Sequence, residues 1–186
     1  MQRRSINIYM DSYIAGVLFG DGTYNKSKSG AYYVWIDQHE RNLSILDRVS
    51  KTLQADGYKI YRYKVPDNKH RVLTYSKKLF VEFSALRGDP VTHFKNLNKR
   101  NKMKFVSGFF DAEGTYTDRI VIYNSHLGLL KEVQNFLKTI GIFPAIYKFG
   151  KIFGLQLYKK EYVEIFKKNI NSTKIASSEL KNVAGC

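Results

Sequence analysis

Two carboxylates, Asp21 and Glu113, end two similar stretches of this 186-residue sequence, IAGVLFGDG at 14–22 and VSGFFDAEG at 106–114. At a helix C-terminus a carboxylate is disfavoured by about 0.3–1 kcal/mol, because the helix dipole is negative there. A divalent metal ion between two such acids would offset their repulsion, since hard cations bind carboxylate and carbonyl oxygens and are often shared with substrate phosphates. The pair therefore predicts a metal site that acts on phosphate. For either stretch alone, a buried helix with a solvated terminal acid is the simpler interpretation.

Both stretches are interpreted as helices with a stripe of small residues just before the acid. Residues four apart lie on one helix face, and small side chains there let helices pack more closely than the usual ~8–10 Å. We therefore expect the two helices to pack on each other and to bring the acids together. The residues predicted at this interface are Gly16, Gly20, Gly108 and Ala112. Gly22 and Gly114 are expected to be left-handed helix caps.

The composition indicates a polyanionic partner. Lys and Arg number 31 against 16 Asp and Glu, which gives a net charge of +15, and 14 tyrosines suit contacts with sugars and bases. The single cysteine, Cys186, excludes an internal disulfide, and residues 1–7 lack the apolar core of a signal peptide. We expect an intracellular protein, in the cytoplasm, an organelle or a nucleoid, without a membrane partner. A basic enzyme with no nucleic-acid role is the competing interpretation of the charge.

The first half is predicted to run helix, hairpin, helix, hairpin, helix, from apolar periodicity and turn residues. The predicted elements are a helix capped by Asp11 or Ser12 and ending at Gly22, a polar basic loop at 23–30, a strand at 31–37, a helix at 43–57, strands at 58–65 and 70–75 joined by a turn, and a helix at 77–86. Residues 87–104 are basic and are interpreted as a turn-rich linker.

The second half repeats this order. The acids are 113 − 21 = 92 residues apart, the apolar positions Leu46, Val49 and Leu53 recur 84 residues later, and KKLFVE at 77–82 recurs 82 residues later as KKEYVE. Gln38 and Asn124 each follow a matching apolar strand. The separation between equivalent residues falls from 92 to 84 to 82 along the chain, as loop deletions in the second copy would produce.

The repeat predicts an α+β fold with two pseudo-twofold-related αββαββα subdomains. Their antiparallel sheets are expected to be saddle-shaped, with the two motif helices packed at the interface. The predicted subdomains are 1–86 and 105–186, joined by the basic linker at 87–104. Residues from 172 onward carry little signal and are expected to fray.

A twofold-related pair of basic sheets suits duplex DNA, whose major groove accepts a two-stranded ribbon. Strand residues alternate between two faces, so we assign Tyr33, Trp35 and Asp37 to DNA and the apolar alternate positions to the helices. For each such residue, an ordinary solvated strand position is the alternative. Lys26 and Lys28 are predicted phosphate contacts, which position a protein without specifying a sequence. The other predicted DNA contacts are Lys59, Tyr61, Tyr63, Arg71, Tyr75, Lys77, Arg119, Tyr123, Ser125, Lys148, Lys151 and Lys159.

The paired stretches resemble the LAGLIDADG motif, and roughly residues 8–170 resemble a monomeric, two-motif LAGLIDADG homing endonuclease of the intron-encoded type. The resemblance implies that the acids at the eighth motif position, Asp21 and Glu113, bind catalytic divalent metal. It also implies that the carbonyls of Gly20 and Ala112 complete the metal shell, and that Gln38 and Asn124 lie near the active site.

The same resemblance implies the cofactor and the partner. Mg²⁺ is the expected metal, with Mn²⁺ or Ca²⁺ able to replace it in binding. The expected substrate is a long, asymmetric double-stranded DNA target cut on both strands across the minor groove. The enzyme is expected to be a monomer with an internal pseudo-dimer.

The sequence departs from the family pattern at two places. Phe19 stands where the motif has an acid, opposite Asp111 in the second copy, and Tyr24 and Tyr116 stand where a lysine is expected on the following strand. The resemblance therefore does not place the basic residue that supports the attacking water. The candidates, each of which could instead be a phosphate contact or a surface charge, are His39, Lys77, Lys95, Lys99, Lys159 and Lys174.

A site-specific, metal-dependent DNA endonuclease is the leading interpretation. In phosphodiester hydrolysis a metal ion lowers the pKa of a bound water and stabilises the departing oxygen, and one acid from each half matches two strands. The alternatives are a maturase that acts on intron RNA, a non-cleaving DNA-binding protein of the same fold, and a structural basic protein. Retention of both acids favours cleavage, because Asn or Lys would suit a binder that faces phosphates.

Overall fold

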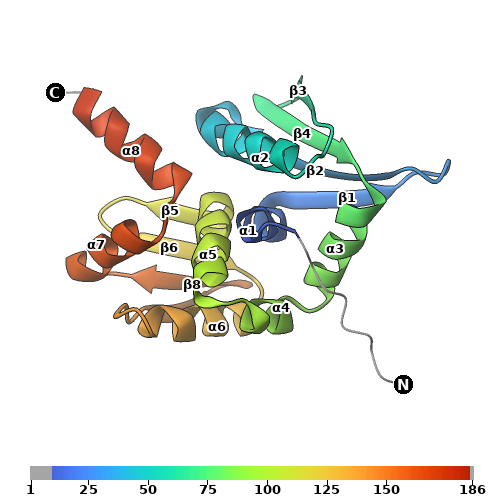
Figure 1. The fold of residues 1–186 in the computed structure, drawn as a ribbon. Helices are drawn as coiled ribbons and strands as arrows, with labels where there is room; N and C mark the ends of the chain where they lie inside the picture. The colour runs from blue at the N-terminus through green and yellow to red at the C-terminus, as the bar shows by residue number, and fades with distance from the viewer. Residues whose placement is uncertain (1–9, 185–186) are drawn as a thin grey trace, which may run out of the picture.

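The computed structural model describes residues 10–184, which form two similar halves, each with a four-stranded antiparallel sheet (Figure 1). The expectations for residues 1–7 and for Cys186 lie outside the described residues. The first half contains α1 (Ser12–Asp21), β1 (Gly22–Lys26), β2 (Tyr32–His39), α2 (Leu43–Ala55), β3 (Tyr61–Val65), β4 (Lys69–Tyr75) and α3 (Lys77–Gly88). The second half contains α5 (Lys99–Glu113), β5 (Gly114–Tyr116), β6 (Ile120–Asn124), α6 (Leu127–Lys138), β7 (Ala145–Phe149), β8 (Ile152–Leu157) and α7 (Lys160–Asn169).

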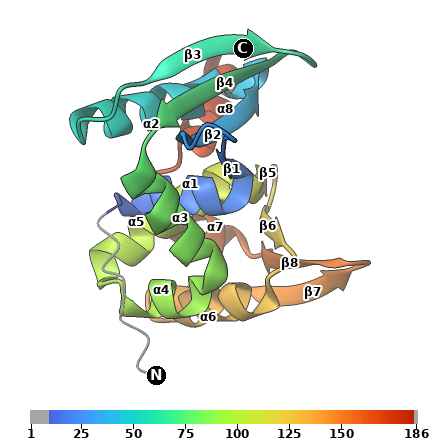
Figure 2. The same ribbon diagram turned by 90° about the vertical axis from the view of Figure 1, so that its right-hand side faces the viewer.

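Both halves have the same αββαββα order, which confirms the predicted α+β fold. The strand orders are β1-β2-β4-β3 and β5-β6-β8-β7, and all pairings are antiparallel. Figure 2 shows the two sheets on opposite sides of the central helices α1 and α5. The β3–β4 turn has positive φ at Asp67 and Asn68, at 62° and 52°, which matches the right-handed twist of a hairpin.

The motif helices α1 and α5 pack at the interface as predicted, because their glycines bring the two backbones into contact. A Cβ atom on Gly16 would lie 2.2 Å from the carbonyl oxygen of Phe105, and one on Gly108 would lie 2.0 Å from that of Tyr13. Neither position can hold a side chain without moving the backbone of the other helix. Around this crossing, α2 and α6 bury their apolar stripes against the sheets, including Leu46, Val49 and Leu53 in the first half.

Three expectations were wrong. The polar loop predicted at 23–30 begins as the edge strand β1, which pairs with β2. The segment predicted to be a turn-rich linker is mostly helical, since it contains α4 (Pro90–Asn96) and the start of α5. The region expected to fray from 172 onward forms α8 (Thr173–Ala184).

The helices α4 and α8 occupy equivalent places, and each crosses to the opposite half. From the first half, α4 packs on α6, where Phe94 contacts Phe136 and Lys95 pairs with Glu132 at 3.3 Å. From the second half, α8 packs on α2, where Ser177 shares a 3.1 Å hydrogen bond with Ser44. Each half therefore holds one helix of the other.

In the part of the chain that the structure describes, no helix combines the length and the apolar character needed to cross a bilayer.

Candidate active site

The two motif helices end side by side, so their terminal acids meet at one end of the interface. Asp21 is the last residue of α1 and Glu113 is the last residue of α5. A Cβ atom on Gly20 would lie 2.5 Å from Cβ of Ala112 and 2.9 Å from Cγ of Glu113. The Glu113 side chain therefore lies against the backbone of the residue that precedes Asp21.

The glycines after the acids are not left-handed caps, contrary to the expectation. Gly22 has φ −74° and ψ 148°, and Gly114 has φ −88° and ψ 155°, which is extended backbone. A Cβ atom on Gly22 would lie 2.4 Å from the carbonyl oxygen of Leu18, and one on Gly114 would lie 2.2 Å from the Phe110 ring. Glycine is required because each chain turns from helix to strand against the last helical turn.

Each acid has an amide partner from a strand of its own half. Gln38, at the end of β2, donates from Nε2 to Oδ2 of Asp21, and it accepts a 3.1 Å hydrogen bond from Asn42. Asn124, at the end of β6, donates from Nδ2 to Oε1 of Glu113 at 3.1 Å. The two amides predicted from the repeat are thus equivalent in the structure, and each fixes the orientation of one carboxylate.

Burial disfavours the charged form of both acids. Burial, and then the negative charge of Glu113, raise the pKa of Asp21 from 3.8 to about 6, against the opposing effect of the Gln38 hydrogen bond. Burial also raises the pKa of Glu113, against the Asn124 hydrogen bond. Two partly desolvated carboxylates that repel each other are typical of a site that binds a cation.

Two cations flank the acid pair in equivalent places. Lys174, on α8, donates from Nζ to the carbonyl oxygen of Gly114 at 2.6 Å, and Arg87, on α3, donates from Nη2 to that of Gly22 at 2.9 Å. Both positive charges lower the pKa values of Asp21 and Glu113. Burial lowers the pKa of Lys174 itself.

Lys174 was among the candidates for a supporting basic residue, whereas Arg87 was missed because it was assigned to the linker. Neither cation falls within the internal repeat, so the repeat gives no signal for them. Of the other candidates, Lys95 pairs with Glu132, and Lys99 lies at the opposite end of α5 from Glu113. His39 accepts a hydrogen bond from the backbone of Arg41.

A cavity of about 340 Å³ opens beside Glu113 on the side of the second sheet. Its lining combines the end of α1, the cation Arg87 and the end of β6. The residues at the end of β6 that line it are Tyr123, Asn124, Ser125 and His126. Ser125 and Tyr123, which were predicted to contact DNA, therefore lie next to the acid pair, whereas His126 was not predicted.

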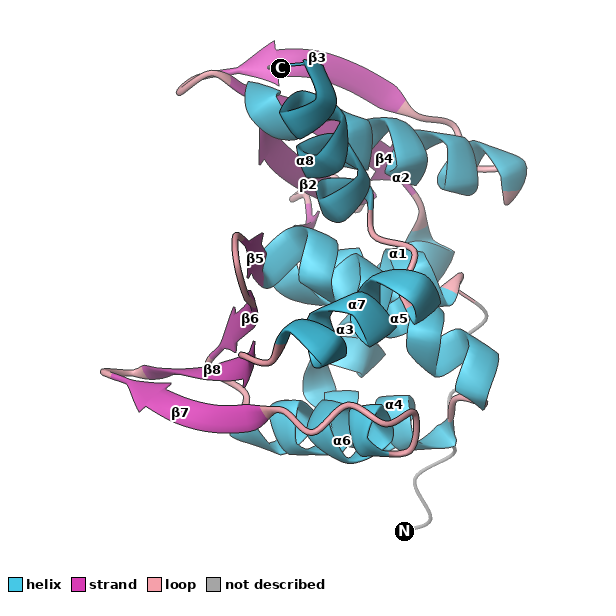
Figure 3. Cartoon of the chain, turned by 90° about the vertical axis from the view of Figure 1, so that its left-hand side faces the viewer, coloured by secondary structure: helices cyan, strands magenta, loops and turns pink. Residues whose placement is uncertain are grey.

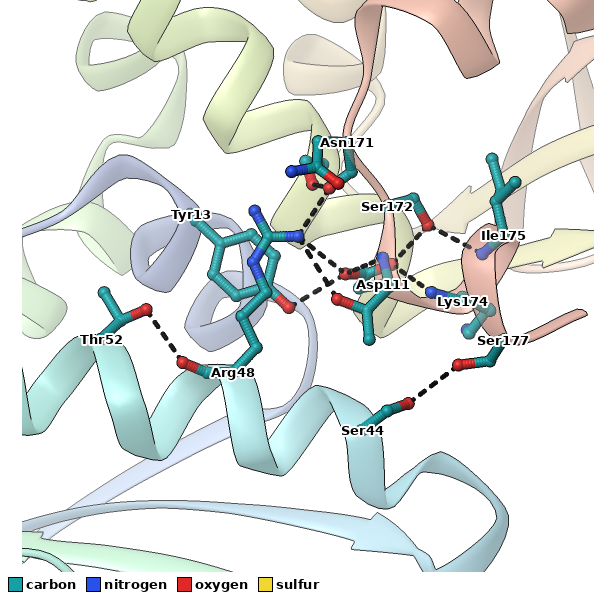
Figure 4. Close-up of polar contacts among 12 residues, drawn as sticks. Tyr13, Ser44, Arg48, Thr52, Asp111, Asn171, Ser172, Lys174, Ile175 and Ser177 are labelled. Atoms are coloured by element: carbon teal, nitrogen blue, oxygen red, sulfur yellow. Dashed lines mark hydrogen bonds and ion pairs between the residues drawn. The ribbon is translucent and has the colours of Figure 1, made fainter. Parts of the chain in front are cut away.

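The sixth motif positions differ between the halves and have different roles. Asp111 is fully buried and accepts hydrogen bonds from the Tyr13 hydroxyl at 2.9 Å, from the Ser172 hydroxyl at 2.6 Å, and from the backbone nitrogens of Thr173 and Lys174 at 3.0 Å each (Figure 4). Asp111 thereby caps the first turn of α8 and holds it against the motif helices.

Phe19, the equivalent residue in the first half, packs against Phe109 and His126 and lies under the guanidinium of Arg87. The departure from the motif at Phe19 therefore makes the two ends of the interface asymmetric.

The acid pair can supply two of the ligands of a divalent ion, and the other ligands must come from groups other than side-chain acids. Within residues 10–184 no group of three or more His, Cys, Asp or Glu side chains is arranged to hold a metal. The carbonyls of Gly20 and Ala112 lie in the last helical turns, where carbonyls lack an intrahelical donor. Two carboxylates, such carbonyls, water and phosphate oxygens make a donor set that suits Mg²⁺ or Ca²⁺.

An aromatic row lies on the face of the first sheet that is turned away from the helices. Tyr33 contacts both Trp35 and Tyr75, and Tyr61 contacts Tyr75, with ring centroids 5.6–5.9 Å apart. Val34 and Ile36, at the alternate positions, are buried. The apolar positions of this strand therefore face the helices, as expected.

The predicted contacts Asp37 and Arg71 pair with each other on this face. Arg71 donates to both carboxylate oxygens of Asp37 at 2.7 Å and lies over the Trp35 ring. Lys59 lies over the Tyr61 ring at the edge of the row.

Several predicted DNA contacts lie away from the outward strand faces. Lys26 and Lys77 lie over Tyr32, which packs against Phe80 of α3 on the helix side. Lys148 alternates with Tyr147 and Phe149 and so points to the helix side of its hairpin, and Lys159 lies over Tyr162 of α7. The remaining three lie in turns or at a strand start: Lys28, Lys151 and Arg119, which pairs with Asp118. These positions suit phosphates at the rim rather than base edges.

Residues 100–171 match the LAGLIDADG-like domain family. Across the whole fold, the chain superposes on the homing endonuclease I-DmoI in complex with DNA and Ca, with a TM-score of 0.74, 23% identity, and coverage of 92% of this chain and 96% of that chain. This chain has the LAGLIDADG fold, with one motif helix in each half. I-DmoI in complex with DNA and Mn is similar with a TM-score of 0.72 and 24% identity, over 87% of this chain and 96% of that chain.

Two further proteins are similar to this chain over part of their length. Full-length WhiA from Thermatoga maritima has a TM-score of 0.66 and 12% identity, over 97% of this chain and 62% of that chain. The uncharacterized protein MJ0314 of Methanocaldococcus jannaschii is 25% identical over 150 residues, which are 73% of this chain and 56% of that protein. The chain therefore spans little more than half the length of this curated relative.

Proposed function

We propose that this LAGLIDADG protein is a site-specific endonuclease that hydrolyses one phosphodiester bond on each strand of a long, asymmetric DNA duplex, across the minor groove. The observation that carries the proposal is the acid pair: Asp21 and Glu113 come from different halves, meet at one end of the interface between the motif helices, and have raised pKa values. A protein that only bound phosphates would be destabilised by two buried negative charges in this place.

The residues around the acids suit this chemistry. With Mg²⁺ bound by Asp21, Glu113 and the carbonyls of Gly20 and Ala112, the ion would supply an activated water and would stabilise the departing oxygen. Gln38 and Asn124 hold the two carboxylates in orientation and leave an amide group beside each for solvent or a phosphate oxygen. Lys174 and Arg87 provide positive charge where the scissile phosphates would carry negative charge, which is the usual role of such cations in phosphoryl transfer.

The two outward sheet faces support DNA as the partner. Both sheets flank the helices that carry the acids, and the net charge of +15 favours a polyanion. The structures of I-DmoI in complex with DNA are of a protein with the same fold, and their similarity supports this choice. We extend the proposal to a monomeric enzyme that acts inside the cell and is encoded within an intron.

The decisive experiment exposes the protein to a library of long duplexes with randomised sequence, with and without Mg²⁺, and sequences any new DNA ends. We expect ends at one recurrent site only when Mg²⁺ is present. Asp21→Asn and Glu113→Gln should each abolish these ends while DNA affinity stays within a few-fold. The matched control is Asp118→Asn, which changes an exposed acid in the β5–β6 turn and should leave cleavage intact.

Three outcomes would contradict part or all of the proposal. Unchanged cleavage by either acid variant would reject the metal-ligand assignment. Specific binding without cleavage under any divalent ion would make the protein a non-cleaving DNA-binding protein. Retention of intron RNA but not of duplex DNA would instead favour a maturase.

A further inference from the structure

The outward face of the second sheet is apolar, unlike that of the first. Alternation along β6, β7 and β8 places eight residues on this face: Val121, Tyr123, Ala145, Tyr147, Phe149, Ile152, Gly154 and Gln156. None of the eight is charged and only Gln156 carries a polar amide, so we call this surface the apolar face. At the corresponding place, the first sheet carries the Asp37–Arg71 ion pair. Because the two sheets have the same topology, the fold itself does not require this difference.

The apolar face is tightly organised around Gly154. A Cβ atom on Gly154 would lie 2.7 Å from Cε2 of Phe149 and 3.2 Å from Cγ1 of Val121, so the Phe149 ring lies directly over the strand. The Phe149 ring also packs edge-on against Tyr123, with centroids 5.7 Å apart. The rings are therefore held in place before any partner binds, which lowers the entropy cost of binding.

This face nevertheless remains open to solvent. Phe149 is 44% exposed, Ile152 is 40% exposed and Tyr147 is 48% exposed. Figure 3 shows the helices of this half on the other side of the sheet. A contiguous exposed apolar patch of this kind marks a contact surface.

The apolar face is continuous with the candidate active site. Tyr123 and Ile152 line the same cavity as Glu113. Lys151, in the β7–β8 turn, is exposed at the border of this face. A duplex whose phosphates reach the acid pair would therefore lay its neighbouring major groove on this face, with its backbone near Lys151.

Among the groups that base pairs present in the major groove, the thymine C5-methyl is the apolar one, and the others are hydrogen-bond donors and acceptors. An apolar side chain can select a base by contact with this methyl group, whereas it leaves a polar base edge desolvated and unpaired. We propose that the second half recognises its half of the target through thymine methyl groups, which contact Phe149, Ile152 and Tyr147. The first half recognises its half-site by hydrogen bonds from the side chains around Arg71. This inference rests on the proposed function, since it names the base chemistry that the same site selects.

The test first assigns each half-site to a sheet by selecting binding sites from the randomised library in Ca²⁺. Ile152→Gln should change base preference in one half-site only. The matched variant Tyr61→Gln, on the outward face of the first sheet, should change preference in the other. Both positions are exposed strand residues, so both variants should fold, as circular dichroism would verify.

The second step replaces thymine by uracil, which removes the methyl group and keeps every hydrogen-bonding group. Uracil in the half-site assigned to the second sheet should weaken binding by about fourfold for each contacted methyl. Uracil in the other half-site should have less than about a twofold effect, and Ile152→Gln should remove the sensitivity to uracil.

The results separate the two proposals. If the protein binds a specific duplex but uracil in the second half-site has no effect, or if the selected half-site contains no thymine, the methyl-recognition proposal is wrong and the endonuclease proposal stands. If no specific duplex is bound at all, the failure lies with the proposed function.

Discussion

Lys174 donates a 2.6 Å hydrogen bond to the carbonyl oxygen of Gly114, the residue that follows the acid Glu113. Lys174 belongs to α8, which packs on the opposite half, so the cation beside the second acid depends on contacts between the halves. Its counterpart Arg87 lies on α3 and makes the same contact with Gly22. The site thus contains one cation that is always charged and one whose pKa is lowered by burial.

Replacing Lys174 by methionine should slow cleavage most at low pH. The positive charge of Lys174 lowers the pKa values of Asp21 and Glu113, so its removal should raise both. The acidic limb of the rate–pH profile should therefore move to higher pH, and the rate near pH 6 should fall by up to about tenfold for each unit by which the pKa rises. The control is Lys168→Met, an exposed lysine of α7. An unshifted profile would mean that Lys174 has only a structural role.

Asp21 should make the protein less stable as pH rises. Its pKa is raised from 3.8 to about 6 on folding, so the folded state favours the protonated form. The associated stabilisation is complete below about pH 4 and is lost as pH rises through about 6, by at most about 3 kcal/mol. Asp21→Asn should therefore raise the free energy of unfolding at pH 7 in urea titrations. A less stable Asp21→Asn variant at pH 7 would contradict the raised pKa.

Calcium should stabilise the protein more at pH 7.5 than at pH 5.5. Metal binding requires the deprotonated carboxylate, and protons compete for Asp21 below about pH 6. We expect a calcium-dependent rise in Tm at the higher pH that shrinks at the lower pH and disappears in Asp21→Asn. Equal rises in Tm at both pH values, or a rise that survives Asp21→Asn, would indicate that calcium binds elsewhere.

A single methyl group at the helix crossing should be strongly destabilising. In Gly16→Ala the new Cβ would lie 2.2 Å from the carbonyl oxygen of Phe105 and 2.6 Å from the backbone nitrogen of Phe109, so α1 and α5 must separate. We expect a loss of about 3 kcal/mol or more in the free energy of unfolding, because backbone on both sides must move. Gly88→Ala is the matched control, since no atom lies within 4 Å of its added Cβ. Equal stabilities of the two variants would refute close packing at Gly16.

Asp111→Asn should release α8 from the motif helices. The amide group of Asn cannot accept all the hydrogen bonds that reach Asp111 from Tyr13, Ser172 and the first turn of α8, and loss of a buried charged acceptor costs about 3–5 kcal/mol locally. Hydrogen exchange of the amides in α8 should accelerate. Ser44→Ala, which removes one peripheral contact with α8, should have a smaller effect. Retained protection of α8 in Asp111→Asn would show that another contact holds the helix.

The internal repeat was sufficient to predict the two halves, the packing of the motif helices and the strand faces. These features follow from local periodicity and from small residues four apart, which are readable without coordinates. The positions of the amides Gln38 and Asn124 were also predictable, because both follow matching strands. For the acids, the repeat predicted that Asp21 and Glu113 lie close together. Their role in metal binding stays a prediction.

The features that could not be predicted depend on tertiary contacts. The helix α8 has its first turn organised by Asp111, which is 62 residues from Thr173 in sequence. Gly22 and Gly114 are required by close approach to the preceding helical turn rather than by a positive φ, and sequence alone does not separate these two causes. Arg87 enters the site from the end of α3, and the residue 82 positions later in the repeat is Asn169, so the repeat does not mark Arg87.

Because α4 packs on the second half and α8 packs on the first, the covalent connection is not all that holds the two halves together. Each half packs against a helix that belongs to the other, and these contacts add to the packing of α1 on α5 that sets the spacing of the two acids. The covalent connection, which itself contains α4, also keeps the two halves at a high effective concentration. In this protein, packing between the two halves therefore sets the geometry of the acid pair, and the covalent connection adds to it by keeping the halves together.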